Sequence, residues 1–560
     1  MSVSVRTWVA AAALSGMVAC PALGEAAGTN TWYVDDDATP GGNGLSWATA
    51  FTNLDDAIES AVKNAGPDVI RVATGRYVPT VRLDPDVPQS ATFLFTDRDA
   101  ITIEGGFQGA GGEFPNRRTL DPTETVIDGA LEMPAGAAAG EACNPDAGDC
   151  FQANGSPGCD GAKCCAFICG IDPFCCEVEW DETCAEEATL FCGMPAPPNV
   201  HHLVTVLDGG QVRFDGFHFI NADATADKDN TDGAAAYVFN ANATFVRCRF
   251  TNNIAEFGGA IAVYEDQKIG QADLIISNSW FEANHANHSG GGIFVDFADA
   301  HVIGSVLMNN TCDAFPGGGG AIFNGGLVEL QNSTVVANLA GGFGGGIRST
   351  PLADVLCTNS ILWGNADFAG NDEQAQLRFG DIKIDYSCVQ GWTGGLGGVG
   401  NIDHNPAFMN PPVLPGGAAA AGEKVDLRLQ PTSPCIDAGS SGLLIADIAD
   451  VDLDGNTKEP TPRDFTHVRR AVNNPFVDNG GEGGIRVADM GAMEFPPITG
   501  DVDADGDVDP YDLAELLSLW GPCGLFCDSD IDKNWVVDGV DARTLIGNWT
   551  SSAPIGLPRP

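Results

Sequence analysis

A short pattern recurs between Arg247 and Asn365, and it constrains the fold more than any other feature of the chain. In each copy an apolar residue stands three positions before an asparagine, and in the first four copies a glycine pair and a small apolar run follow. Successive asparagines are 31, 26, 28 and 27 residues apart, a range of periods typical of repeat architectures. The aligned asparagines are Asn253, Asn284, Asn310, Asn338 and Asn365.

The chemistry of each unit indicates short β-strands joined by tight corners. Segments such as NSWF, TVV and ILW are β-branched or aromatic and too brief for helices. The glycine pairs suit corners that need a positive φ or a close backbone approach. Units of this kind stack as coils of a parallel solenoid, where a corner asparagine can bond its copies above and below. We therefore predict a mostly β fold with an asparagine ladder along its axis.

The GG[AG]I units and their preceding NSxF or NSxL segments resemble the right-handed parallel β-helix repeats of pectin-lyase-like proteins. The resemblance is greatest to secreted bacterial proteins related to polymorphic outer-membrane proteins. It implies a right-handed parallel β-helix over residues 25–497. Near its start, Asn53 is the predicted N-cap of an amphipathic helix that covers the first coil. It implies no single activity, since the fold hosts lyases, hydrolases, adhesins and proteins without known chemistry.

Residues 1–24 read as a secretory signal peptide, because an apolar run follows Arg6 and small residues follow the run. Cleavage after Gly24 is expected, and lipid attachment at Cys20 is the alternative. No later stretch has 18 uncharged apolar residues, so we expect no transmembrane span in the mature chain. The predicted location is secreted, either extracellular or at the cell surface.

The acidic balance of the chain limits its partners. Its 27 basic and 76 acidic residues leave a net charge of -49, so nucleic acid and other polyanions should be repelled unless a cation bridges them.

Ten of the 18 cysteines fall within residues 143–192, which we predict to be a disulfide-stapled insert. A zinc cluster is the alternative there, but the insert lacks histidine and a repeated CxxC.

Catalytic candidates arise from the resemblance, since pectate-lyase-like enzymes use calcium-binding carboxylates beside an Arg or Lys base. Arg247 and Arg249 alternate with inward-facing positions, and Asp296 and Asp299 lie one coil further on. A solvated sheet face is the alternative interpretation of these four residues.

Other polar groups leave a similar choice between a metal site and an ordinary polar loop. The histidine pair is close enough in sequence to share a metal, and two acidic stretches could hold a cation. The second acidic stretch is half a calcium loop, with Thr461 at the twelfth place. These groups are His285 with His288, Asp35 to Asp37, and Asp450, Asp452 and Asp454.

The strongest chemical signal lies in residues 498–549, where two calcium-loop sequences start 29 residues apart and each precedes one helix. Gly506 holds the sixth place of the first loop, whereas Trp535 replaces glycine in the second. Cys523 and Cys527 lie between the loops, where they could close a small disulfide ring. The predicted Ca²⁺ ligands are Asp501, Asp503, Asp505, Asp507, Asp509 and Asp512 in the first loop, and Asp530, Asp532, Asn534, Val536 (by its carbonyl), Asp538 and Asp541 in the second.

These two half-hands resemble a type I dockerin domain, followed by a tail at residues 550–560. The resemblance implies calcium-dependent docking to a cohesin-like or cell-surface partner. Two hypotheses of function follow. The favoured one is a secreted, non-catalytic surface or matrix protein that presents an extended binding face. The alternative is a polysaccharide lyase or glycoside hydrolase of pectin-lyase-like fold, acting on extracellular polysaccharide.

Overall fold

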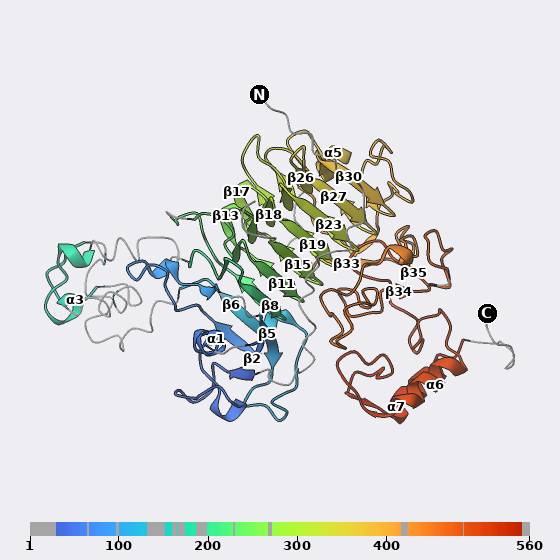
Figure 1. The fold of residues 1–560 in the computed structure, drawn as a ribbon, viewed down its shortest axis with the longest axis horizontal. Coiled ribbons are helices and arrows are strands. Elements are labelled where there is room, and N and C mark those ends of the chain that lie inside the picture. The colour runs from blue at the N-terminus through green and yellow to red at the C-terminus, as the bar shows by residue number, and fades with distance from the viewer. Residues whose placement is uncertain are drawn as a thin grey trace.

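In the computed structural model, the described part of the chain is residues 30–550 without 64–65, 97–99, 132–149, 151, 160–164, 166–173, 186–198, 228–229, 267–271, 416–423 and 485. Most of it winds into one parallel β-helix, with a small helical module at the C-terminal end (Figure 1). The predicted parallel β-helix is confirmed. The predicted signal peptide, Cys20 and residues 551–560 of the tail lie outside the described residues.

Each coil passes through sheets that we number 1 to 4, and strands from successive coils pair in parallel. Sheet 1 has ten strands, in chain order: β1 (Asn30–Val34), β2 (Asp68–Ala73), β5 (Ala100–Phe107), β8 (Gln211–Asp215), β11 (Asn242–Val246), β15 (Asp273–Ser277), β19 (Asp299–Ile303), β23 (Leu327–Gln331), β27 (Asp354–Thr358) and β30 (Asp381–Asp385). Sheet 2 follows it in each coil with nine: β3 (Gly75–Tyr77), β6 (Thr125–Asp128), β9 (His218–Ile220), β12 (Arg249–Thr251), β16 (Trp280–Glu282), β20 (Val306–Met308), β24 (Thr334–Val336), β28 (Ile361–Trp363) and β31 (Cys388–Val389).

The remaining strands of the coils form sheets 3 and 4. Sheet 3 has eight strands: β4 (Phe93–Phe95), β7 (Val204–Leu207), β10 (Ala236–Phe239), β14 (Ile261–Tyr264), β18 (Ile293–Asp296), β22 (Ile322–Asn324), β26 (Ile347–Ser349) and β29 (Leu377–Arg378). The short sheet 4 consists of β13 (Ile254–Phe257), β17 (His285–Ser289), β21 (Thr311–Cys312) and β25 (Leu339–Ala340).

The apolar residue of each repeat points into the core, as predicted. Phe219, Phe250 and Phe281 stack along sheet 2, with ring centroids 4.8 and 4.4 Å apart. The column continues through aliphatic side chains that are also fully buried, namely Leu307, Val335 and Leu362. Full burial of one such side chain contributes about 1.5–3 kcal/mol, so in-register stacking is a large part of the stability of the β-helix.

The predicted asparagine ladder is present and completely buried. Nδ2 of Asn253 donates to Oδ1 of Asn284 at 3.0 Å, and the same bond joins each asparagine to the next as far as Asn365. Each Oδ1 also accepts the backbone N–H of the preceding asparagine. The ladder ends on Oε1 of Gln376, from α5 (Glu373–Gln376), at 2.8 Å.

A second ladder, which sequence reasoning missed, explains the NS pair that occurs in three of the repeats. The asparagine of the pair takes a positive φ at the corner, for example 47° at Asn278, a conformation that asparagine tolerates. The following serine is buried and accepts the backbone N–H of its copy one coil earlier: Oγ of Ser305 accepts from Ser279 at 3.0 Å. The same bonds extend through Ser333 and Ser360 to Ser387.

The first coil of the β-helix is covered by a helix. At the first coil, α1 (Leu54–Val62) buries its apolar face, and Asn53 caps it by accepting the N–H of Asp56, as predicted. Single turns of 3-10 helix occur at Trp47–Thr49, Pro88–Ser90, Pro122–Glu124 and Ser441–Leu443. None of the helices in the described residues has the length and apolarity that crossing a membrane requires.

The segment after the last coil packs against the outer face of sheet 2. It contains the antiparallel pairs β32 (Phe408–Asn410) with β33 (Asp426–Leu429) and β34 (Ala471–Val472) with β35 (Val487–Ala488). Val306 and Met308 of the sheet share one buried cluster with Cys435 and Met490 of this segment. The outer face of sheet 2 is therefore covered around β20.

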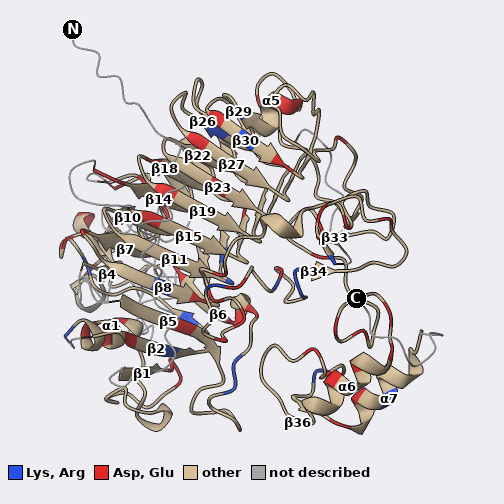
Figure 2. Ribbon diagram, turned by 45° about the vertical axis from the view of Figure 1, so that its right-hand side comes forward, with Lys and Arg blue, Asp and Glu red and all other residues tan. Residues whose placement is uncertain are grey.

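The C-terminal module contains α6 (Pro510–Ser518), α7 (Gly539–Gly547) and the short antiparallel pair β36 (Gly521–Pro522) and β37 (Val536–Val537). Figure 2 shows it as a separate body beside the β-helix, with acidic residues in its loops. Val508 and Val537, at the eighth place of each loop, are fully buried in its core with Leu516 and Leu545.

The cysteine-rich insert contains disulfides, as predicted. Cys150 bonds Cys159 and Cys175 bonds Cys184, and the insert also contains α3 (Phe174–Glu177). Trp180 is fully buried among these cysteines. The expected ring between Cys523 and Cys527 is wrong, because both are free thiols.

Replacing Asn310 with alanine should lower the free energy of unfolding by about 3 kcal/mol, because Asn284 loses its acceptor and Asn338 its donor inside a dry core. Chemical denaturation measures this change. The matched control is Asn43→Ala, which removes one exposed backbone bond and should cost less than about 0.5 kcal/mol. Equal midpoints for the two variants would contradict a stabilising role for the ladder.

Candidate functional site

The first acidic loop of the C-terminal module is held in a cation-binding shape by its own backbone. The N–H groups of Asp505 and Gly506 donate to the two carboxylate oxygens of Asp501, at 3.1 and 3.0 Å. At the other end, Asp512 accepts the N–H of Val502 at 2.7 Å and that of Asp509 at 2.8 Å. The first and twelfth residues are thus fixed on the same side of the loop.

The second loop repeats these bonds at the same loop positions. Asp530 accepts from Asn534 at 3.1 Å and from Trp535 at 2.7 Å. Asp541 accepts from Ile531 at 2.7 Å and from Asp538 at 2.8 Å. Because the hydrogen bonds match position by position, the two loops have the same backbone shape.

The carboxylates of each loop converge. Ligand atoms of Asp501, Asp503 and Asp512 lie within 4.8 Å of one another, and so do those of Asp530, Asp532 and Asp541. Burial raises the pKa of Asp501 to about 7, and the neighbouring carboxylates add to the shift. A hard divalent cation with oxygen ligands removes that repulsion, so the residues present fit Ca²⁺.

The other predicted ligands take different places in the loops. Asp509 and Asp538 are the N-caps of α6 and α7, and each accepts a backbone N–H two residues on, at 2.7 Å. Asp507 and Asp509 form a further convergent group with Asp512. In the second loop, Asn534 accepts the N–H of Val536 at 2.9 Å.

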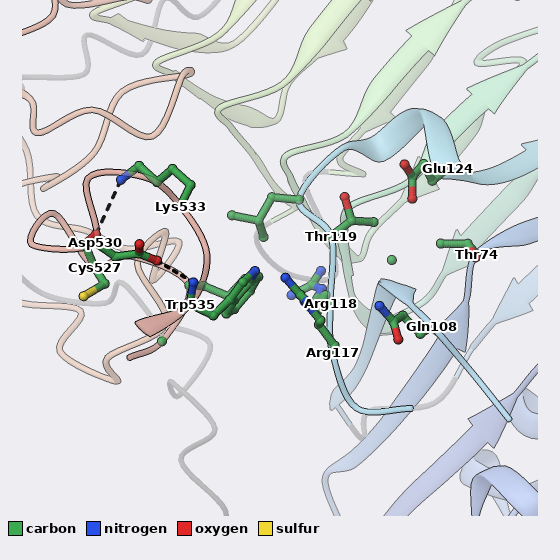
Figure 3. Close-up of a pocket in the computed structure, with 14 residues that line it drawn as sticks. Thr74, Gln108, Arg117, Arg118, Thr119, Glu124, Cys527, Asp530, Lys533 and Trp535 are labelled. Atoms are coloured by element: carbon green, nitrogen blue, oxygen red, sulfur yellow. Dashed lines mark hydrogen bonds between the residues drawn. The ribbon is translucent and has the colours of Figure 1, made fainter. Parts of the chain in front are cut away.

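Trp535, which departs from the glycine of the loop pattern, does not distort the second loop. It adopts a φ of 75°, close to the 98° of Gly506. Its ring lies 4.7 Å from the guanidinium of Arg117, which belongs to the loop after β5 of the β-helix (Figure 3). The side chain therefore joins the module to the first coils by a cation–π contact.

Ion pairs fasten the module at a second place. Asp528, between the two loops, accepts from Arg463 at 2.7 Å and from Arg469 at 2.8 Å. Burial tends to raise the pKa of Asp528, but the two guanidiniums outweigh it and hold the pKa below its usual value. Arg469 also pairs with Glu515 of α6 at 2.9 Å. The contact surface consists largely of residues in and between the loops.

A cavity of about 520 Å³ lies between the module and the first coils. Arg117, Lys533 and Trp535 line one part of it, and Gln108 and Thr119 another (Figure 3). Asp530, the first ligand position of the second loop, also borders this cavity. The loop therefore faces both its predicted ion and the interface.

The four catalytic candidates are not brought together. Arg247 is 2% exposed and bonds Asp215, which also binds Arg118 at 2.8 Å. Arg249 pairs with Glu282 at 2.6 Å. The expectation that Arg247 shares a free outer face with Arg249 is wrong, because the C-terminal segment covers Arg247 and Val451 accepts one of its N–H groups.

Asp296 and Asp299 lie at a different corner of the coil, where sheet 3 passes into sheet 1. Asp299 pairs in register with Asp273 of the preceding coil. Two residues further along the same strand, His301 bonds Glu329 at 2.8 Å. Sequence reasoning missed this polar group, although the alternation along residues 299–303 already places Asp299 and His301 on one face.

The remaining polar groups divide between ordinary loops and one larger acidic cluster. His285 bonds Thr311 and His288 packs on Phe257, and no cluster of metal-ligand type found in the described residues contains either histidine. Asp35 accepts the N–H groups of Asp37 and Ala110, as an acidic turn does. Around residues 450–454, the carboxylates of Asp447 and Glu459 join the predicted aspartates.

Comparisons with known proteins give no family assignment. No protein-family model matches the chain, and no curated protein matches it. Among solved structures, the pectate lyase Pel9A is 12% identical, with 83% of this chain and 96% of that chain covered and a TM-score of 0.28. A rice weevil pectin methyl esterase is 14% identical over 62% of this chain and 76% of its own, with a TM-score of 0.24. A glycoside hydrolase is 10% identical over 67% and 95%, with a TM-score of 0.23. No residue role is transferred from these proteins.

Replacing Trp535 with glycine should separate the two tasks of the second loop. Calcium affinity should be retained, because glycine adopts the positive φ freely. Loss of the contact with Arg117, about 1 kcal/mol, should raise the rate of proteolytic release of the module about fivefold. Trp520→Ala, in an exposed tryptophan after α6, is the control and should leave the rate unchanged. Release at the wild-type rate would show that Trp535 does not fasten the module.

Proposed function

We propose that the chain is an extracellular, non-catalytic β-helix protein that binds polysaccharide on its outer surface. Its C-terminal module binds two calcium ions and docks the protein to a cohesin-like partner. The observation that carries the proposal is the equivalence of the two acidic loops, in which the same positions make the same hydrogen bonds.

Bound calcium would neutralise the crowded carboxylates and link the start of each loop to the helix that follows. The chain's own residues supply the arrangement: backbone N–H groups orient the first and twelfth carboxylates, and a buried valine anchors each loop to the module core. Calcium is therefore proposed as a structural ion.

The docking role is supported by a duplicated apolar surface on the two helices. Leu517 and Ile546 occupy equivalent positions and are 53% and 57% exposed. Trp520 and Trp549 follow their helices in the same way and are 53% and 39% exposed. Exposed apolar groups repeated in this way favour a protein partner.

A second candidate function, polysaccharide cleavage, is favoured by one observation. Asp273, Asp299, His301 and Glu329 gather on the outer face of sheet 1. Burial raises the pKa of Asp299, and the charge of Asp273 adds to this. A protonated and an ionised carboxyl group are the pair that glycoside hydrolysis requires.

Titration calorimetry should detect two calcium ions per chain. Asp503→Asn and Asp532→Asn should each weaken one site by at least about tenfold, because each removes a charged ligand while leaving the first and twelfth residues intact. Asp86→Asn, in an exposed turn of the β-helix, is the matched control. Chelation should lower the melting temperature of the module and spare that of the β-helix. An absence of bound calcium, or an unchanged melt after chelation, would refute the structural role.

Assays for reducing and unsaturated ends decide between the two functions. The main proposal predicts no product above background from neutral or acidic polysaccharides in the presence of calcium. The second candidate predicts product that disappears in Asp299→Asn and in His301→Gln, since both act at the outer-face group. Asp381→Asn, at the same strand position three coils further on, is the control that should keep full activity.

A further inference from the structure

The outer face of sheet 3 bears a column of aromatic and arginine side chains near its C-terminal end. Phe294, Phe323, Arg348 and Arg378 occupy the same register position in β18, β22, β26 and β29. The rings of Phe294 and Phe323 stack 4.8 Å apart at an interplanar angle of 7°. The parallel register therefore aligns two rings and two guanidiniums along the axis of the β-helix.

Loops between the coils add further rings to this column. The ring of Phe343 lies 6.0 Å from the guanidinium of Arg348 and 4.7 Å from that of Arg378. Three more phenylalanines around it are largely exposed: Phe315 at 64%, Phe368 at 57% and Phe379 at 44%. We call this group the aromatic–arginine surface; it comprises Phe315, Phe323, Phe343, Arg348, Phe368, Arg378 and Phe379.

Neither arginine of this surface has an acidic partner in the described residues. Arg378 donates to the amide oxygen of Gln374, and Nε of Arg348 is buried without a hydrogen-bond partner in that part of the chain. Burial lowers the pKa of Arg348, and the nearby Arg378 contributes. In a chain with 76 acidic and 27 basic residues, two adjacent guanidiniums without an acidic partner in the described residues indicate a site for an external anion.

Acidic residues beside the exposed phenylalanines have other partners. Asp367 accepts the N–H groups of Gly344 and Ala369, at 3.1 and 2.8 Å. The Asp313 side chain is 73% exposed and lies 3.6 Å from His285. Screening limits the reach of the net negative charge of the chain to about 8 Å at physiological salt.

The chemistry of the surface selects its ligand. Stacking on a ring uses the face of a guanidinium, whereas a carboxylate is bound at its N–H edge in a planar, bidentate way, so the two contacts are compatible. The negative faces of the exposed rings accept the C–H groups of a sugar ring. We propose that the aromatic–arginine surface binds an acidic polysaccharide, with its sugar rings on the exposed phenylalanines and its carboxylates on Arg348 and Arg378. This inference rests on the proposed polysaccharide-binding function and assigns a site and a ligand class to it.

The test uses the full chain with two probes, an oligogalacturonide and the same oligosaccharide fully methyl-esterified. The wild-type protein should bind the acid at least about tenfold more tightly than the ester, because only the acid pairs with the arginines. The double variant R348Q/R378Q should lose that preference, whereas Arg378→Lys should retain part of it. Phe368→Ala, in an exposed ring, should weaken both probes. Arg428→Gln, an exposed arginine paired with Asp426, is the control and should change neither.

The outcomes separate this site from the proposed function. Acid binding that is equal in the wild-type protein and in R348Q/R378Q, at unchanged melting temperature, overturns the site but leaves polysaccharide binding in place. Preference for an acidic peptide over the oligogalacturonide at these residues also overturns it. If no neutral or acidic glycan binds the wild-type chain at all, the polysaccharide-binding function fails together with the site.

Discussion

The structure depends on the requirement that buried polar groups be hydrogen-bonded. The coils of β16, β20, β24 and β28 each bury an asparagine amide and a serine hydroxyl, and neither group has all of its partners within its own coil. The next coil supplies them, since Asn284 bonds both Asn253 and Asn310. Adjacent coils are therefore fixed in register as well as packed, because a shift by one residue would leave every rung unpaired at about 1–3 kcal/mol each. The ladder ends where Gln376 provides the last acceptor.

Fixed register determines what the outside of the β-helix can do. Side chains at one strand position repeat at the strand spacing of about 4.8 Å, so side chains of successive coils form columns on the surface. On sheet 2 the outward side chains of the later strands, such as Val306 and Met308, are apolar and are covered by the C-terminal segment. The column on sheet 1 includes His301 and Glu329, and that on sheet 3 runs from Phe294 to Arg378. The open faces of the same scaffold thus carry a titratable group and an aromatic–arginine group at different corners.

The repeated features of the fold could be predicted from the sequence. The side-chain contacts between segments far apart in the sequence could not. The period, the apolar position and the glycine corners specified the β-helix and its asparagine ladder, since these are local and recur. The charge partner of Arg247 was not predictable, because Asp215 lies in the preceding coil and the covering Val451 comes from a segment without a repeat. The sheet 3 column was missed for a related reason. Its members come from strands and loops of unequal spacing, and only the register brings Arg348 beside Phe323.

Trp535 departs from the glycine of the calcium-loop pattern, and its role can be identified only in the folded chain. As a sequence feature it weakens the second calcium loop, since glycine is the residue that adopts a positive φ without strain. In the structure, the loop keeps its hydrogen bonds and the indole contacts Arg117 of the β-helix. The bonds that shape the proposed calcium site and the contact that fastens the module therefore involve the same residue. The backbone of Trp535 serves the first task and its side chain the second, whereas the first loop, with Gly506 at the equivalent place, lacks such an aromatic anchor.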